Sequence, residues 1–278
     1  MRFARVTDGD AYASALVFDD GVRLVEEWRR GDPLATVFVP PDTTQGTRCT
    51  SELIPFDAVR FLPPLSASTK VICLGLNYRE HVEEVRGDRP AQPALFVKLP
   101  DAFVGHGGAT FMPRISRQYD YEGEIAVVIG RECRNVKKAD AMAYVFGFTI
   151  LMDGSVRDYQ KHSLSAGKCF FRSSALGPWI SSIDSIDDFR SLKLETRLNG
   201  ETVQSASAEY MIHDVPSAIE YISQWTPLHP GDIISTGTCA GIGMAQQPPR
   251  WLKPGDVVDV AVSSVGTLRC RVASECEK

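Results

Sequence analysis

The sequence lacks the features that mark membrane proteins, nucleic-acid-binding proteins and disulfide-stabilised secreted domains. It has no run of about 18 apolar residues, the length that a membrane-spanning helix needs. It has no block of basic residues, and its net charge of −5 makes a nucleic-acid backbone a poor partner. Charged residues interrupt residues 1–21, which contain no apolar signal core, so we expect a cytoplasmic protein.

Three chemical motifs are also missing. The seven cysteines are scattered without a Cys-x-x-Cys pair, which indicates reduced, mostly buried thiols and no thiolate zinc site. The glycines of residues 235–243 could cradle an anion, but they lack the Gly-x-Gly-x-x-Gly spacing of a dinucleotide-binding turn. No Gly-x-Ser-x-Gly nucleophile elbow is present. Nucleotide binding and α/β-hydrolase chemistry are therefore not indicated.

The composition is ordinary for a globular protein, with 44% hydrophobic and 23% charged residues in a chain of 278. This length is sufficient to bury a sizeable core. A proline pair at Pro63 and Pro64 predicts a boundary between a small, β-rich N-terminal domain, residues 1–65, and a larger domain, residues 70–278.

Short apolar runs between turn signals predict more strands than helices. Residues 15–25 and 191–204 have the pattern of β-hairpins, the second with Asn-Gly at its turn. Residues 78–87 and 215–228 have helical character, and residues 138–151 indicate a helix that runs into a strand. The sequence therefore predicts a β-rich α+β fold.

Acidic residues recur at every second position from Asp120 to Glu124. In a strand, Glu122 and Glu124 point to the same face, and their mutual repulsion favours a compensating cation such as Mg²⁺, Mn²⁺ or Ca²⁺. Asp153 follows another apolar, strand-like run and could supply a third carboxylate. By themselves, the two glutamates are more typical of an exposed strand face than of a metal site, and an Asp before Gly is typical of a turn.

Other polar residues suit catalysis or substrate binding, but each also has a structural explanation. His81 and Glu84 have the i, i+3 spacing that brings side chains together on a helix, which suits a general base or a simple surface pair. Lys168 enters an apolar run, where it could bind a carboxylate or enolate or extend its stem to solvent. Arg157 and Gln160 follow Asp153 closely, either as substrate ligands or as a surface network.

Taken in order, these segments resemble the fumarylacetoacetate hydrolase family over residues 70–273. The resemblance rests on GLNYREHVEE (75–84), FVK (96–98), DYEGEIAVVIG (120–130), GFTILMDGSVRDYQ (147–160), GKCF (167–170), GPW (177–179), LNGE (198–201) and LHPGDIISTGTCAGIG (228–243). No single segment is decisive, but the ordered set is specific.

The resemblance implies a β-rich roll of mixed sheets with a smaller N-terminal domain, assembled as a homodimer. It implies that Mg²⁺ or Mn²⁺ is bound by Glu122, Glu124 and Asp153, with Ca²⁺ as a possible substitute in vitro. The remaining implied roles are a water-activating dyad of His81 and Glu84, an enolate-stabilising Lys168, and substrate binding by Arg157, Gln160 and Thr238.

Several positions depart from the family pattern without removing a ligand or the dyad. Met152 replaces the usual Asn before the metal-binding Asp, and Gly-Ser-Val follows that Asp in place of Val-Ser-Ala. Cys239 follows Thr-Gly-Thr where the family often has proline. Residues 169–172 read Cys-Phe-Phe-Arg where the family commonly has Ser-Phe-Asp-Thr, which favours an unusual substrate.

The leading functional hypothesis is hydrolysis of a carbon–carbon bond in a β-diketo acid of the acylpyruvate or fumarylpyruvate type, as in aromatic catabolism. In this hypothesis His81 activates water, and Lys168 and the metal hold the departing enolate. The alternative is another reaction through the same metal enolate: oxaloacetate decarboxylation, or isomerisation or dehydration of a 2-keto acid. A non-catalytic binding protein is a third hypothesis, which the intact acidic triad disfavours.

Overall fold

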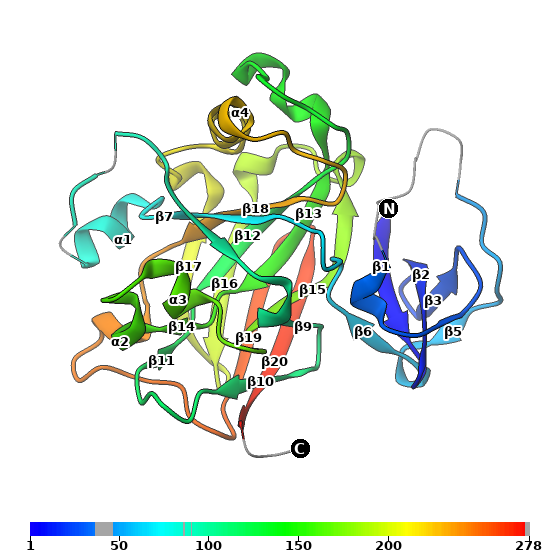
Figure 1. Cartoon of the computed structure of the whole chain (residues 1–278), viewed down its shortest axis with the longest axis horizontal. Helices are drawn as coiled ribbons and strands as arrows, with labels where there is room; N and C mark the ends of the chain where they lie inside the picture. Colours follow the sequence, from blue (N-terminus) through cyan, green and yellow to red (C-terminus); the bar gives the residue numbers. More distant parts are fainter. Residues whose placement is uncertain (37–46, 86, 90, 276–278) are drawn as a thin grey trace.

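The computed structural model describes residues 1–36, 47–85, 87–89 and 91–275. Within these residues the chain forms a 13-stranded sheet, a five-stranded sheet and a two-stranded sheet (Figure 1). The sheets are mixed, because parallel pairs such as β18 (Ile233–Thr238) with β7 (Val71–Gly75) stand beside antiparallel ones. The predicted β-rich α+β fold is confirmed.

The large sheet runs in the order β5 (Ile54–Pro55), β3 (Gly21–Leu24), β2 (Ala11–Val17), β1 (Arg2–Thr7), β15 (Ser174–Ser182), β13 (Val145–Met152), β12 (Gly123–Ile129), β18, β7 and β8 (Ala94–Lys98). Short strands flank this path: β4 (Arg29–Arg30), β6 (Arg60–Leu62) and β9 (Phe103–Val104). The five-stranded sheet runs β10 (Ala109–Met112), β20 (Gly266–Ser274), β19 (Val257–Val262), β16 (Lys193–Leu198) and β17 (Glu201–Ser207). The remaining sheet pairs β11 (Tyr119–Asp120) with β14 (Ser155–Val156).

The α-helices of the described residues are few and short. They are α1 (Arg79–Glu84), α2 (Arg157–Gln160), α3 (Leu164–Lys168) and α4 (Val215–Trp225). The predicted helix at 215–228 is confirmed as α4, whose N-cap Asp214 accepts a hydrogen bond from the Ser217 N–H at 3.0 Å. The predicted helix at 78–87 corresponds to the shorter α1, and residue 86 lies outside the described residues.

Both predicted hairpins form. The turn between β16 and β17 places Asn199 and Gly200 at φ values of 54° and 86°, which these two residue types tolerate best. Residues 138–144 form a 3-10 helix that leads directly into β13, in agreement with the predicted change from helix to strand. The six cysteines of the described residues are free and four are buried, while Cys276 lies outside them.

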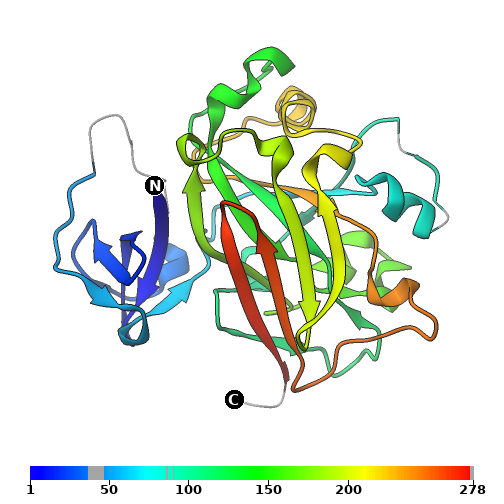
Figure 2. The same ribbon diagram turned by 180° about the vertical axis from the view of Figure 1, so that it is seen from behind.

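Strands β1 to β6 form a lobe at one side of the molecule (Figures 1 and 2). Backbone pairing joins this lobe to the rest, because β1 lies antiparallel to β15 with Phe3 opposite Ile180. The domain boundary predicted near Pro63 and Pro64 stays a prediction, since one hydrogen-bonded sheet crosses it.

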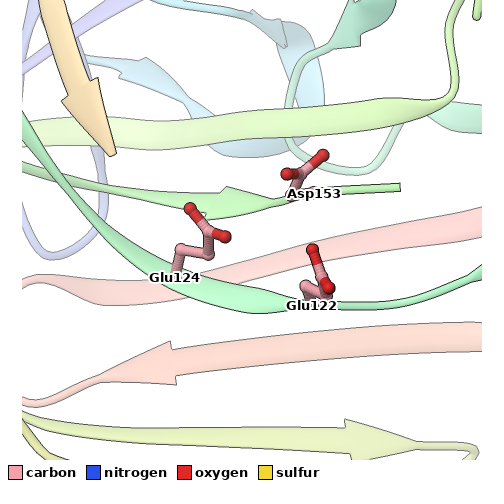
Figure 3. Close-up of side chains that lie close together, drawn as sticks. All are labelled: Glu122, Glu124 and Asp153. Carbon is pink, nitrogen blue, oxygen red and sulfur yellow. The ribbon is translucent and has the colours of Figure 1, made fainter. Parts of the chain in front are cut away.

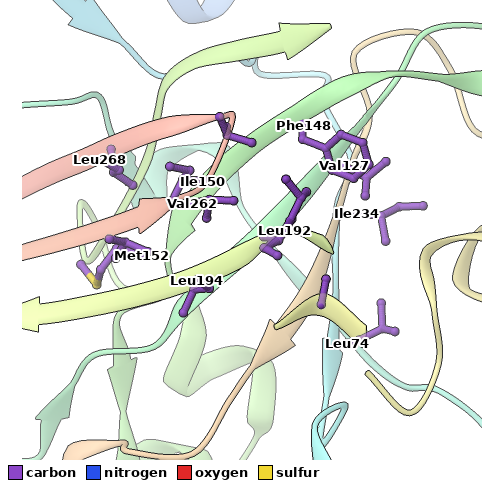
Figure 4. Packing of buried hydrophobic residues seen from close by; sticks show 14 of the residues in the cluster. Leu74, Val127, Phe148, Ile150, Met152, Leu192, Leu194, Ile234, Val262 and Leu268 are labelled. Carbon is purple, nitrogen blue, oxygen red and sulfur yellow. The ribbon is translucent and has the colours of Figure 1, made fainter. Parts of the chain in front are cut away.

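The main hydrophobic core fills the space between the large sheet and the five-stranded sheet (Figure 4). Along β12, Ile125 and Val127 pack into this core, whereas Ala126 and Val128 belong to a second apolar cluster on the opposite face. This alternation is the two-residue period of a strand buried on both faces. It also fixes the orientation of the acidic residues that precede these positions.

The large sheet is strongly curved. Lys98, at the end of edge strand β8, places its ammonium 2.6 Å from Asp153, which directly follows β13. Three strands separate β8 from β13 in the sheet, a distance of roughly 19 Å if the sheet were flat. A lysine side chain cannot cover that distance, so the sheet curls to bring its edge over the ends of β12 and β13.

Candidate metal centre

The three predicted metal ligands lie together at the ends of β12 and β13 (Figure 3). One carboxylate oxygen from each of Glu122, Glu124 and Asp153 lies within 4.8 Å of the others, and all three residues are buried. The cluster occupies the face of the sheet on which the second apolar cluster packs, with Phe96 nearby on β8. Such a site keeps water away from the carboxylates and strengthens their interaction with a cation.

Strand pairing explains why residues distant in sequence meet here. Gly123 lies opposite Met152 in the antiparallel β12–β13 pair, so Glu122 lies opposite Asp153. The Asp153 N–H donates to the Glu122 carbonyl at 2.8 Å and fixes this register. Glu124 is two residues further along β12 and therefore projects to the same face as Glu122.

Two buried lysines surround Asp153. The Lys168 ammonium lies 2.7 Å from one Asp153 oxygen and also donates to Glu122. The Lys98 ammonium donates to the other Asp153 oxygen at 2.6 Å and to the Lys168 carbonyl. Lys98 was not among the predicted site residues, although its position two residues after the buried Phe96 was a signal of an inward-facing lysine.

Arg157 is held by acidic residues. Its guanidinium forms ion pairs with Glu122 at 2.7 Å and with Asp120 at 2.8 Å. Asp120 is fully buried and also accepts hydrogen bonds from the backbone N–H groups of Gly243 and Met244 at 2.8 and 3.0 Å. Arg157 therefore fixes Glu122 from the side opposite Lys168, and Asp120 fixes Arg157.

The two glutamates of the cluster differ in their protonation. Burial alone would raise the pKa of Glu122, but the charges of Arg157 and Lys168 hold it well below its ordinary value. Burial and the negative charge of Asp153 raise the pKa of Glu124 to about 8, against the lowering effect of Lys168. The side of the cluster nearest Glu124 is thus the part with the least compensating positive charge.

The donor set fits a hard divalent cation. Carboxylate oxygens are the ligands that Mg²⁺ and Mn²⁺ prefer, and they also bind Ca²⁺. Within the described residues, four buried carboxylates face three buried cations around this site: Asp120, Glu122, Glu124 and Asp153 against Lys98, Arg157 and Lys168. A bound cation would balance the remaining charge, most directly at Glu124.

The predicted dyad forms on α1. His81 is buried, and its Nδ1 atom lies 3.2 Å from a Glu84 oxygen. The other Glu84 oxygen accepts a hydrogen bond from the Gly241 N–H at 2.8 Å, which ties α1 to the glycine-rich loop after β18. His81 also lies close enough to Glu122 to contribute, after Arg157 and Lys168, to the low pKa of that carboxyl. The dyad is thus tied to the loop that follows β18, the strand in which Thr238 lies opposite Glu124.

The predicted substrate-binding residues have different surroundings. Thr238 donates to the Gly123 carbonyl at 3.0 Å and accepts from Gln204 at 2.8 Å, so its hydroxyl braces the strand between the two glutamates. Gln160 accepts a hydrogen bond from Arg157 at 3.2 Å. The Gln160 Nε2 atom is buried and has no hydrogen-bond partner within the described residues. The substrate-binding roles of Arg157, Gln160 and Thr238 stay predictions.

Two serines of the site were also missed. Ser155 donates to a Glu122 oxygen at 3.1 Å, and Ser235 donates to a Glu124 oxygen. Serine is so common in strands and turns that neither position carried a signal in the sequence. Each hydroxyl orients a carboxylate that would bind the cation.

Comparison with known proteins identifies the protein family. The sequence profile for the fumarylacetoacetate (FAA) hydrolase C-terminal domain matches residues 70–273. The chain therefore belongs to the fumarylacetoacetate hydrolase family, as the ordered motifs indicated. Members of this family are enzymes, and the acidic cluster of this chain is a possible metal site within that fold.

Two relatives with similar sequences are both named oxaloacetate tautomerases. The chain is 40% identical over 219 residues to the mitochondrial oxaloacetate tautomerase Fahd2a of Rattus norvegicus. This alignment covers 78% of this chain and 70% of that protein. It is 41% identical over 206 residues to the oxaloacetate tautomerase YisK of Bacillus subtilis, covering 72% and 68% of the two chains.

Solved structures extend the similarity to the N-terminal lobe. The fumarylacetoacetate hydrolase EaFAH from Exiguobacterium antarcticum superimposes with a TM-score of 0.82 at 30% identity, covering 99% of this chain and all of that one. A 5-carboxymethyl-2-hydroxymuconate delta-isomerase from Mycobacterium smegmatis has a TM-score of 0.81 at 29% identity, with the same coverage. In the described part of the chain, no helix is long and apolar enough to cross a membrane.

Proposed function

We propose that this chain is a divalent-metal-dependent enzyme that enolises small 2-oxo acids, with keto–enol tautomerisation of oxaloacetate as its leading reaction. The observation that carries the proposal is the buried cluster of Glu122, Glu124 and Asp153, with Lys168 hydrogen-bonded to two of its carboxylates. The two relatives with 40% and 41% identity to this chain are named oxaloacetate tautomerases, which favours this reaction over hydrolysis.

Mg²⁺ or Mn²⁺ held by the three carboxylates would supply Lewis-acid polarisation of a 2-oxo group and would stabilise the negative charge of its enolate. Lys168 supports the same charge. Burial lowers its pKa, but Asp153 and Glu122 raise it above its ordinary value, so the side chain stays an ammonium donor. Its position beside the carboxylates lets it donate a hydrogen bond to an oxygen of a bound acid.

His81 is the residue best placed to move the proton. Its Nδ1 atom is engaged with Glu84, which leaves Nε2 to take a proton from the carbon next to the 2-oxo group. Enolisation is complete when a proton is delivered to the oxygen of the resulting enolate. In the reverse direction the enol oxygen gives up its proton, and protonated His81 delivers a proton to the carbon, which completes ketonisation. Glu84 orients the ring and stabilises its protonated form, and the Gly241 amide keeps Glu84 in place.

Hydrolysis of a carbon–carbon bond in an acylpyruvate or fumarylpyruvate is the second candidate. The His81–Glu84 pair favours it, because a histidine oriented by a carboxylate can equally deprotonate water. The full-length similarity to EaFAH also supports it. Decarboxylation of oxaloacetate and dehydration of a 2-keto acid use the same enolate and are separated from tautomerisation by their products.

The test uses protein stripped with EDTA and then supplied with Mg²⁺ or Mn²⁺. Enol oxaloacetate is followed by its ultraviolet absorbance, and products of oxaloacetate and an acylpyruvate are identified in parallel. We expect metal-dependent interconversion of the oxaloacetate tautomers above the rate with metal alone. Pyruvate and CO₂ would indicate decarboxylation, and two acid fragments from the acylpyruvate would indicate hydrolysis. No turnover of either substrate would favour the binding-protein hypothesis.

The family resemblance also leads us to propose a homodimer, and the charged residues that interrupt residues 1–21 lead us to propose a cytoplasmic location. Sedimentation velocity at micromolar protein concentration tests the first statement, and a single species with the mass of one chain would contradict it. Fractionation of the source cells tests the second.

A further inference from the structure

A large cavity lies between the N-terminal lobe and the rest of the chain, and its lining residue Phe103 separates it from Lys98 beside the acidic cluster, whose ammonium lies 5.7 Å from the ring centre. Its volume is about 1360 Å³, and its described lining includes Phe61 from the lobe and Phe103, Arg172 and Trp179 from the larger part. None of the described lining residues belongs to the acidic cluster or the dyad. The cavity exceeds the roughly 300–1,000 Å³ of most small-molecule sites, so a ligand would occupy only part of it.

Arg172 is an unusual cation in this cavity. Its guanidinium is partly buried, and burial lowers its pKa with no carboxylate near enough to oppose the effect. It forms no ion pair within the described residues and lies instead over the Phe111 ring, 4.6 Å from the ring centre. A partly desolvated cation without a counter-ion favours the binding of an anion.

The backbone holds Arg172 in place at a conformational cost. Its φ of 50° lies in the left-handed region that arginine rarely adopts. Two backbone hydrogen bonds fix it there, from the Arg172 N–H to the Asp101 carbonyl at 2.9 Å and from the Phe111 N–H to the Arg172 carbonyl at 2.8 Å. The backbone of Arg172 is thus fixed before any ligand binds, and the Phe111 ring contacts the guanidinium, which lowers the entropic cost of binding.

Aromatic rings supply the apolar part of the cavity. The Phe61 ring lies 6.1 Å from that of Trp179 and 5.8 Å from that of His106, and Phe171 packs 6.2 Å from Phe111 while remaining 59% exposed. Burial and the neighbouring Arg269 lower the pKa of His106, so this ring stays neutral and adds no charge.

The described lining also holds two further arginines, Arg5 and Arg60, and three aspartates, so its formal charges balance. Asp32 accepts a hydrogen bond from the Leu34 N–H at 2.9 Å, and the side chains of Asp10 and Asp101 are exposed. These carboxylates would oppose a highly charged anion, whereas one carboxylate group could pair with Arg172.

We propose that this cavity is a second ligand site, for a small monocarboxylate with a flat apolar body. Arg172 pairs with the carboxylate, and the aromatic side chains cover the body. Phe171 and Arg172, from the stretch that departs from the family pattern, then serve this site, while Lys168, just before that stretch, serves the metal centre.

The test measures binding of phenylacetate, benzoate and cyclohexylacetate by calorimetry. The protein carries Mn²⁺ and saturating oxalate, a bidentate oxygen chelator that occupies the metal centre. Arg172→Met removes the charge but keeps the stem at the same backbone conformation. Arg23→Met is the matched control, because Arg23 also lies over a phenylalanine ring, 5.5 Å from Phe18, but does not line the cavity.

We expect one equivalent of at least one probe to bind, with affinity about tenfold or more weaker in Arg172→Met, since a charge-assisted pair is lost. Arg23→Met should bind like the unchanged protein, Arg172→Lys should retain part of the affinity, and phenethylamine should not bind. Absence of binding by all three acids, competition by oxalate, or equal affinity in Arg172→Met would overturn the proposal. Absence of binding would also be the outcome if a second copy of the chain fills the cavity. These readouts do not depend on the tautomerase activity.

Discussion

Replacing Lys168 with methionine removes one buried positive charge while keeping most of the side-chain volume. The ammonium lies between Glu122 and Asp153 and is almost completely buried. Its loss leaves two carboxylates with less compensating charge in a site from which water is excluded. Removing one partner of a buried ion pair costs about 3–5 kcal/mol.

That cost converts to a large change in melting temperature. For domains of about 150–250 residues, 1 kcal/mol corresponds to roughly 2–4 °C, and longer chains lie at the low end. We therefore expect metal-free Lys168→Met, a chain of 278 residues, to melt about 6–10 °C below the unchanged protein. A divalent cation at one hundred times its dissociation constant adds about 2.7 kcal/mol.

The metal should stabilise the variant more than the unchanged protein, because it replaces the missing charge and no longer has a neighbouring ammonium to repel it. The assay is thermal unfolding followed by circular dichroism, with EDTA and with Mn²⁺. Lys161→Met is the control, since Lys161 is an exposed lysine near the same helices. An unchanged melting temperature of Lys168→Met in EDTA, or a smaller Mn²⁺-induced increase than in the unchanged protein, would refute the reasoning.

Three further predictions concern the dyad, the protonation of the cluster and its supporting residues. His81→Asn should lower turnover by about a hundredfold or more while Mn²⁺ affinity measured by calorimetry stays the same; a parallel loss of affinity would assign His81 to the metal instead. Because Glu124 must lose its proton to bind a cation and its pKa is about 8, Mn²⁺ affinity should rise about 50-fold from pH 6 to pH 8 and then level off. Glu124→Gln should remove most of that pH dependence, and an equally steep profile in this variant would contradict the assignment. Asp120→Asn should lower the free energy of unfolding by about 2 kcal/mol in denaturant titrations and weaken Mn²⁺ binding, since Arg157 loses its second carboxylate; normal affinity would show that Arg157 is fixed without it.

Local patterns in the sequence predicted the parts of the site that depend on local geometry. Strand alternation placed Glu122 and Glu124 on one face, and helical spacing paired His81 with Glu84. The third carboxylate of the candidate site, Asp153, needed the register of β12 against β13, which spacing within one segment does not contain. The order of the family motifs supplied that information.

The contacts that the sequence did not predict depend on the curvature of the sheet or on very short elements. Lys98 reaches Asp153 because β8 curls over strands that separate the two in the sheet order. Helices α2 and α3 have only four and five residues, and the N-cap of α2, Val156, forms no side-chain hydrogen bond that would mark its start. Elements of this length are held by packing and not by propensity.

Titration of the EDTA-stripped protein with Mn²⁺, followed by the initial rate of oxaloacetate tautomerisation, tests most directly whether the three carboxylates form a catalytic metal centre. The rate above that of free Mn²⁺ should rise until one equivalent is bound per chain, and Asp153→Asn should show no such saturable increase at the same concentrations. A metal-free rate equal to the Mn²⁺-saturated rate, or an unchanged titration in Asp153→Asn, would contradict the account.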